Sequence, residues 1–176
     1  MSARLGLAIL LVAAVPTLAR AQSNVEAGAW TISPLLGVAF DPDGDASLAL
    51  AGVLDYHLTP AFALEGELGH VFDTAPDNPD VDASLTTAHV GILYILDFAA
   101  RPYVAAGIGA GHYSIELRPG GQSFDTTELG FNLGGGLIYP LDDRLAVRGD
   151  FRYFKHIDNV PSSWRFAGGV TLKLSE

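Results

Sequence analysis

Hydrophobic and polar residues alternate with a period of two from Ala27 almost to the C-terminus, in long runs. A period of two indicates β-strands, and these runs exceed the five or six residues of an average strand. The pattern predicts eight strands, over residues 27–40, 46–58, 61–72, 84–96, 102–115, 126–139, 143–156 and 163–174.

The connections between these strands alternate in length. Those after the second, fourth and sixth strands are tight and carry Pro or Asp: "LTPA", "DFAARP" and "PLDD". Those after the odd strands include two longer loops, the acidic "DTAPDNPDVDA" (73–83) and "LRPGGQSFD" (117–125). We therefore predict an all-β fold, an eight-stranded antiparallel up-and-down barrel with one short-loop rim and one long-loop rim.

Each strand has one face of nearly pure hydrocarbon, as at Leu145, Val147, Phe151 and Tyr153 in the seventh strand. A soluble lipocalin-like barrel shows the same period with the opposite orientation, so the composition of the polar face must decide. A face in water would be filled with long solvated side chains, whereas this one is crowded with Gly and Ala, which suit the narrow lumen of eight strands. We expect the hydrocarbon face to lie against lipid, which makes the barrel a transmembrane one.

Aromatic residues gather near the predicted strand ends, as in the interfacial girdles of membrane barrels. They are Trp30, Phe40, Tyr56, Phe62, Phe72, Tyr94, Tyr139, Tyr153 and Trp164.

Acidic and basic residues nearly balance on the polar face. An unpaired charge in a narrow interior is costly, so near-balance is expected inside a barrel. We predict a structural ion-pair network in the lumen. Its members are Asp55, Glu65, Glu67, Glu128, Arg148, Asp150, Arg152 and Arg165.

The tripeptide Arg148-Gly149-Asp150 has the sequence of a cell-adhesion signal. It lies in mid-strand, where Arg148, Asp150 and Arg152 share the polar face because residues two apart point the same way. We therefore expect these charges to point inward, with Glu65 and Glu67 as candidate partners, and not to form a displayed ligand.

The first 21 residues have the features of a secretory signal peptide. Arg4 is followed by the apolar run "LGLAILLVAAV" and by the small-x-small sequence "ARA" at residues 19–21. We expect cleavage before Gln22, so that residues 22–176 form a single barrel domain. The apolar run is too short to span a bilayer as a helix.

Composition narrows the possible functions. The 176-residue chain has 10 basic and 20 acidic residues and a net charge of −10, which argues against a nucleic-acid partner. Cysteine is absent, so disulfides and thiolate chemistry are excluded. We expect no cofactor.

Four segments combine tight turns with strands that carry inward charges: "DYHLTPAFALEGELGH" (55–70), "RPYVAAGIGAGHY" (101–113), "LGGGLIYPLDDRLAVRGDFRY" (133–153) and "RFAGGVTLKL" (165–174). In these segments the chain resembles the small outer-membrane barrels of the OmpA/OmpX type. They follow the recurring pattern of that family, in which a tight Thr-Pro or Asp turn is followed by a strand with inward charges. The resemblance implies both termini in the periplasm, loops at the cell surface, an interior salt-bridge network, and contact with outer-membrane lipid and the insertion machinery.

Two features depart from the family. Its members commonly end the last strand on an aromatic residue that helps insertion, whereas this chain ends Leu172-Lys173-Leu174-Ser175-Glu176. There is also no room for an appended peptidoglycan-binding domain.

Two glycine-containing motifs could carry other chemistry. "DPDGD" (41–45) resembles the start of a calcium loop, but its Gly is misplaced and Gly52 stands where a bidentate Glu is needed, so we expect an acidic turn. "GIGAG" (107–111) lies within a strand, so we expect lumen glycines and not a phosphate loop.

The five histidines lack metal-ligand spacing, and we expect no metal site. His57, His89 and His156 have polar-face or rim phases, which predicts hydrogen-bonded histidines in the lumen or its mouth. His156 invites comparison with the His-x-Ser element of lipid A deacylases, but residue 158 is Asp, which cannot replace the serine nucleophile.

The sequence thus predicts a non-enzymatic outer-membrane barrel with a structural or surface-interaction role, a plugged lumen and acidic loops. The alternatives are a low-conductance pore, a soluble exported barrel that binds an apolar ligand, and a lipid A-modifying enzyme. No surface partner is indicated.

Overall fold

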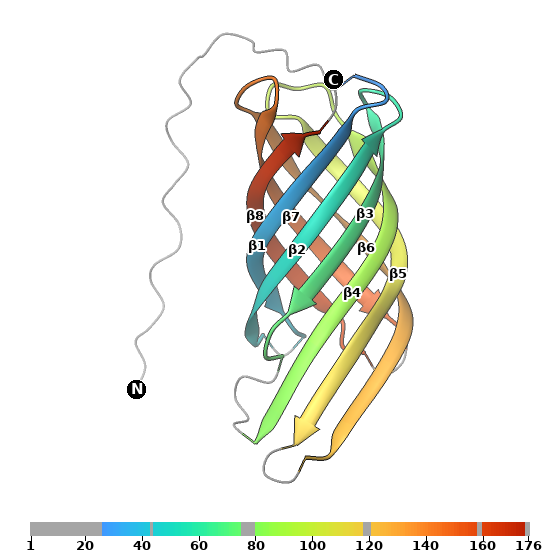
Figure 1. Ribbon diagram of the computed structural model, residues 1–176, viewed down its shortest axis with the longest axis vertical. Helices are drawn as coiled ribbons and strands as arrows, with labels where there is room; N and C mark the ends of the chain where they lie inside the picture. Colours follow the sequence, from blue (N-terminus) through green and yellow to red (C-terminus); the bar gives the residue numbers. More distant parts are fainter. Residues whose placement is uncertain (1–25, 43, 75–79, 118–120, 158–159, 175–176) are drawn as a thin grey trace, which may run out of the picture.

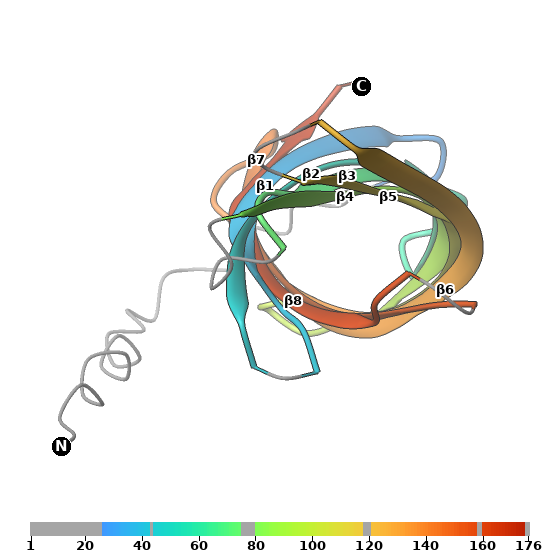
Figure 2. The same cartoon turned by 90° about the horizontal axis from the view of Figure 1, so that it is seen from below.

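The computed structural model is a closed barrel of eight antiparallel strands in sequence order (Figures 1 and 2). It describes residues 26–42, 44–74, 80–117, 121–157 and 160–174, so the predicted signal peptide lies outside the described residues. The strands are β1 (Trp30–Phe40), β2 (Ala46–His57), β3 (Phe62–Val71), β4 (Val81–Ile95), β5 (Pro102–Leu117), β6 (Ser123–Pro140), β7 (Leu145–His156) and β8 (Ser163–Lys173).

Each strand pairs with the next one in the chain, and β1 pairs with β8 to close the ring. The closing register runs from Thr31 opposite Lys173 to Phe40 opposite Trp164. Closure leaves no sheet edge with unpaired backbone groups, which a bilayer would not tolerate. The predicted fold class is therefore confirmed.

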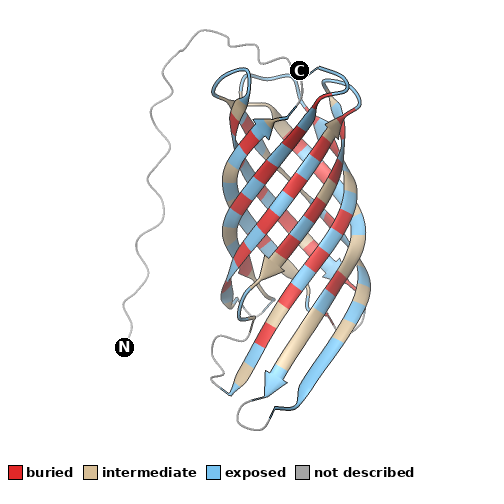
Figure 3. Cartoon of the chain, viewed as in Figure 1, coloured by how far each residue is buried: buried red, intermediate tan, exposed pale blue. Residues whose placement is uncertain are grey.

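Burial alternates along the strands (Figure 3). In β6, for example, Leu129, Phe131 and Leu133 point outward and are 68%, 48% and 59% exposed. Asn132, between two of them, points inward and is 2% exposed. The hydrocarbon face is thus outside and the polar face inside, as predicted. Among the described residues no helix is long and apolar enough to cross a membrane.

Three strands are longer than predicted. β4 starts at Val81, β5 continues to Leu117 and β6 starts at Ser123, so both long loops are shorter than expected. Polar pairs across the strands support this extension: Ser114 donates to Asp125 (2.6 Å), and His112 and Thr127 are joined at 2.8 Å. Together β4, β5 and β6 project beyond the rest of the barrel at the long-loop end (Figure 1). We call residues 81–84, 111–117 and 123–128 the projecting sheet.

The first strand is shorter than predicted. It begins at Trp30, because Gly28 has a positive φ of 89° that does not fit a strand. The Gly28 amide instead donates to the His57 carbonyl (2.7 Å), which ties the chain to the end of β2.

Aromatic side chains line both ends of the outer wall. At the short-turn end Trp30 packs on Tyr56 (ring centroids 4.8 Å apart) and Phe62 packs on Tyr94 (4.9 Å). At the long-loop end Trp164 lies against Tyr153 (4.7 Å). These positions agree with the predicted girdles.

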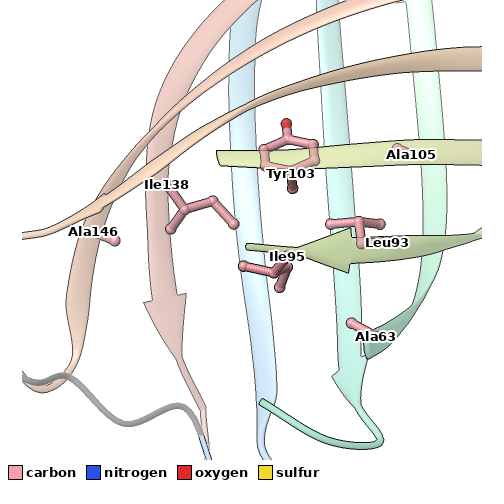
Figure 4. Packing of buried hydrophobic residues seen from close by; sticks show 7 residues of the cluster. All are labelled: Ala63, Leu93, Ile95, Tyr103, Ala105, Ile138 and Ala146. Atoms are coloured by element: carbon pink, nitrogen blue, oxygen red, sulfur yellow. The ribbon is translucent and has the colours of Figure 1, made fainter. Parts of the chain in front are cut away.

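A layer of buried hydrophobic residues lines the lumen near the short-turn end (Figure 4). Its members are Ala63, Leu93, Ile95, Tyr103, Ala105, Ile138 and Ala146. The Tyr103 hydroxyl points away from Leu93 and Ile95 (Figure 4). The ring therefore separates this apolar layer from the polar part of the lumen.

Candidate functional site

The centre of the lumen holds a buried ion-pair cluster, which we call the interior cluster. Its arginines come from β7 and β8, and most of its acids come from β2 and β3. In an eight-stranded ring β3 lies opposite β7, so the ion pairs cross the lumen from wall to wall. The cluster comprises Asp55, Glu65, Glu67, Tyr103, Arg148, Asp150, Arg152 and Arg165.

Arg148 is fully buried, and its guanidinium is shared among three other strands. Nη1 donates to Asp55 Oδ2 (2.9 Å), Nη2 to Glu65 Oε2 (2.8 Å) and Nε to the Tyr103 hydroxyl (3.1 Å). Each nitrogen of this guanidinium thus has a partner. Charge-assisted hydrogen bonds of this kind are about twice as strong as neutral ones.

Arg152 and Arg165 each bind one glutamate through two nitrogens. Arg152 donates to both oxygens of Glu65, with Nη2 2.7 Å from Oε2, and Nε donates to Asp150 Oδ2 (3.0 Å). Arg165 donates two hydrogen bonds of 2.8 Å to the Glu67 carboxylate. Such fork-to-fork pairs fix the angle of both side chains, so β7 and β8 are held to β3 across the lumen.

Asp150 joins the arginines to one another. Its Oδ2 accepts hydrogen bonds from Tyr103 (2.6 Å) and Arg152, and its Oδ1 accepts one from Arg165 (3.2 Å). Asp150 is 5% exposed and Arg148 is not exposed at all. The charged side chains of the Arg148-Gly149-Asp150 tripeptide therefore lie inside the barrel, out of reach of a receptor.

Seven of the eight residues proposed from the sequence come together here, and Glu128 does not. The ion pairs of Arg148, Arg152 and Arg165 do not include Glu128, which lies nearer the long-loop end of β6. There its Oε2 accepts a hydrogen bond from the Val160 amide (3.5 Å). The inward phase was correct for Glu128, but its height along the axis puts it beyond the cluster.

Tyr103 is the member that the sequence analysis missed. It is 3% exposed and bonds to both Arg148 and Asp150. It shares the inward phase of Ala105 and Gly107, so the period of two could have identified it. Tyr103 carries no charge, however, so the balance of acidic and basic residues on the polar face did not select it.

Two buried histidines, His89 and His156, face the lumen on the long-loop side of the cluster, as their phase predicted. One ladder row runs His89, Gly109, Gly130, His156 across β4 to β7, so the two glycines leave room for both rings, whose centroids lie 6.1 Å apart. The expectation of hydrogen-bonded histidines is wrong for His89, because neither of its ring nitrogens has a partner among the described residues. The neighbouring glycines offer no side chain that could bond to it.

The other motifs also have clear positions. Asp41 Oδ1 accepts the amides of Gly44 (2.8 Å) and Asp45 (2.9 Å), which makes "DPDGD" an acidic turn, although Asp43 lies outside the described residues. Glycines of "GIGAG" make way for side chains in the lumen, since a Cβ on Gly111 would meet the His156 ring. The described residues contain no group of three or more His, Cys, Asp or Glu side chains that could hold a metal ion.

Comparison with known proteins points in the same direction. The family model of the outer membrane protein beta-barrel domain matches residues 5–173. A comparison with curated protein sequences found no match.

Several solved structures have the same fold. Neisserial surface protein A is 17% identical, with a TM-score of 0.67 over 83% of this chain and 96% of that one. The N-terminal β-barrel domain of Pseudomonas aeruginosa OprF is 18% identical, with a TM-score of 0.63 over 84% and 98%. The outer membrane protein OprG of P. aeruginosa is 13% identical, with a TM-score of 0.66 over 88% and 99%.

The solved structures share the fold, and the family match agrees with a lipid-facing hydrocarbon wall and not with a soluble exported barrel. The chain belongs to the family of the outer membrane protein beta-barrel domain, and it is an eight-stranded barrel of the outer membrane.

Proposed function

We propose that the protein is a structural or surface-interaction barrel whose lumen is plugged by the interior cluster. The observation that carries this proposal is the pairing of Arg148, Arg152 and Arg165 with acids on the opposite wall, all of them buried. An eight-stranded barrel has an interior just wide enough for side chains. Ion pairs that cross it occupy the space through which solutes would pass.

The long-loop end is the part that would meet a partner. Described acidic residues concentrate there, as at Asp41, Asp45, Asp73, Asp80 and Asp82. The described chain begins and ends at the opposite, short-turn end, where the Gly28 amide donates to the His57 carbonyl (2.7 Å) and the Leu174 amide to the Trp30 carbonyl (2.8 Å). We propose that the short-turn end faces the periplasm, that the acidic loops face outward, and that the chain reaches the membrane through a cleaved signal peptide and the insertion machinery.

We propose further that the protein is not an enzyme. A deacylase would need a serine activated by His156, yet neither His156 ring nitrogen bonds to a side chain of the described residues. Asp158, two positions after His156, lies outside the described residues.

Planar-bilayer recordings of the refolded protein test the plug. We expect the parent to show no steady open channel, and Glu67→Ala to raise the conductance, because it removes the carboxylate that holds Arg165. Asp125→Asn, a change of one acid in the projecting sheet, serves as the matched control and leaves conductance unchanged. A large, steady channel in the parent would refute a plugged lumen.

A low-conductance pore is the second candidate. Small cavities open at both ends of the barrel, one beside His57 and Arg144 and the other beside Phe40 and Tyr113. The interior cluster lies between them. Small conductance steps in the parent that change in size with Glu67→Ala would favour this candidate.

A further inference from the structure

A small cavity at the short-turn end lies apart from the interior cluster. Its inner wall is built by Thr31, His57 and Thr171, from three strands. Its outer wall includes Arg101 from the turn between β4 and β5, Arg144 from the turn between β6 and β7, and Lys173 at the end of β8. Residues far apart in the chain thus meet around one opening.

His57 gives this cavity a buried group without a partner. The residue is 3% exposed, and its ring Nδ1 has no hydrogen-bond partner within the described part of the chain. The two threonine hydroxyls beside it are engaged, since Thr31 bonds to Asp55 (3.4 Å) and Thr171 to Ser33 (2.8 Å). Buried polar groups are nearly always paired, so a ring nitrogen at a cavity wall indicates a ligand or solvent partner.

The charges around the opening favour an anion. Three cations, Arg101, Arg144 and Lys173, line the opening with two acids, Asp142 and Asp143, in a chain whose net charge is −10. Arg101 also donates to the Pro60 carbonyl (3.3 Å) and lies near Asp97. One oxygen of Asp142 is committed to its turn, because it accepts the amides of Arg144 and Leu145 at 2.8 Å each. Arg101 and Arg148 also place positive charge near the His57 ring.

We propose that this cavity binds a phosphate group. Guanidinium and ammonium groups that converge from several directions match the tetrahedral oxygens of phosphate, and an imidazole N–H adds a hydrogen-bond donor. The opening is at a rim of the barrel, beside the outer wall that faces lipid. The phosphate therefore comes either from a phospholipid headgroup or from free phosphate in solution.

The experiment follows the His57 ring by NMR. The protein, labelled with ¹⁵N at histidine, is refolded in maltoside micelles without phosphate and titrated in two arms. One arm adds inorganic phosphate against sodium chloride of equal ionic strength, and the other adds a short-chain phosphatidylglycerol against a phosphate-free glycolipid. We expect a saturable shift of the His57 signals with unchanged His89 and His156 signals. Saturation by phosphate alone assigns free phosphate, and saturation only by phosphatidylglycerol assigns the headgroup.

Variants distinguish binding in this cavity from nonspecific attraction of phosphate to positive charge. The pair Arg144→Gln with Lys173→Gln should weaken the apparent affinity at least tenfold, whereas Lys155→Gln, at the long-loop end, should leave it unchanged. Lys173→Gln alone provides the same comparison if the double variant does not fold. Absence of a saturable shift in both arms, an equal response to the phosphate-free additions, or unchanged affinity in the variants would overturn the proposal. None of these outcomes bears on conductance, so the proposed plug is tested separately.

Discussion

At the scale of single residues, the interior cluster depends on every charge having a partner in place. Arg148 has no exposed surface and binds Asp55, Glu65 and Tyr103. Removing one partner of a buried pair leaves the other charge uncompensated, which costs far more than the pair contributes over a well-packed apolar core. The cluster therefore fixes which residues can stand at these positions.

Arg148→Glu tests this dependence. We expect it to lower the free energy of unfolding by about 3–5 kcal/mol, because it puts a fourth carboxylate among Asp55, Glu65 and Asp150. The measurement is urea unfolding of the refolded protein, followed by tryptophan fluorescence. Arg144→Glu, on an exposed turn, is the control and should cost less than about 1 kcal/mol. An unchanged midpoint for Arg148→Glu would place residue 148 in water and reverse the assignment of inside and outside.

Glycine in the lumen and glycine on the outer wall should respond differently to the same change. A Cβ on Gly109 would lie 2.7 Å from the His89 ring, whereas a Cβ on Gly149 would meet nothing within 4 Å. We expect Gly109→Ala to destabilise the barrel by about 1–3 kcal/mol through overpacking, and Gly149→Ala to leave it unchanged or slightly more stable. The same urea titration measures both, and equal effects would contradict the tight packing of the lumen.

At the scale of elements, β6 is the longest of the three strands that continue into the projecting sheet, with 18 residues. Its outward face is Leu133, Phe131 and Leu129 along the hydrocarbon part and then Thr127 and Asp125, which pair with β5. The projecting sheet is therefore held by polar cross-strand pairs, whereas the rest of the wall contacts lipid.

Lysine substitutions on this face locate the boundary. Leu133→Lys should destabilise the barrel by about 2–4 kcal/mol, since residue 133 lies midway between Tyr139 at the short-turn end and Thr127, and a charge near the bilayer centre is costly. Thr127→Lys, on the same face, should cost less than about 1 kcal/mol, which corresponds to the loss of its cross-strand pair with His112. Guanidinium unfolding from lipid vesicles measures both. Similar costs at the two positions would mean that the bilayer covers all of β6.

At the scale of the whole molecule, the period of two was enough to predict the barrel and its orientation. It placed Arg148, Arg152, Glu65 and Glu67 on one inward face, and the abundance of Gly there identified that face as the lumen. Phase does not report height along the axis, however. Height depends on register between strands far apart in the chain, which is why the sequence pattern included Glu128 in the cluster.

The extension of β4, β5 and β6 was also beyond prediction from single segments. Asp82 and Asp125 suggested loops because each was considered without its neighbours. In the folded chain Asp82 is opposite Glu116 and Asp125 is opposite Ser114, so pairing keeps these residues in strands. Only the neighbouring strand could have revealed this.

The projecting sheet makes the long-loop rim of the barrel asymmetric about the barrel axis. A barrel with a level rim would present the same profile to every neighbour as it turns within the membrane. In this barrel the projecting sheet of β4, β5 and β6 extends the wall on one side only, whereas β1 and β8 end closer to the middle of the barrel (Figure 1). A large molecule that approaches parallel to the membrane surface would contact the projecting sheet from one side. From the other side it would reach the mouth of the lumen directly. With the long-loop end facing outward, as proposed, the rotation of the barrel about its axis decides which of these two sides such a molecule meets.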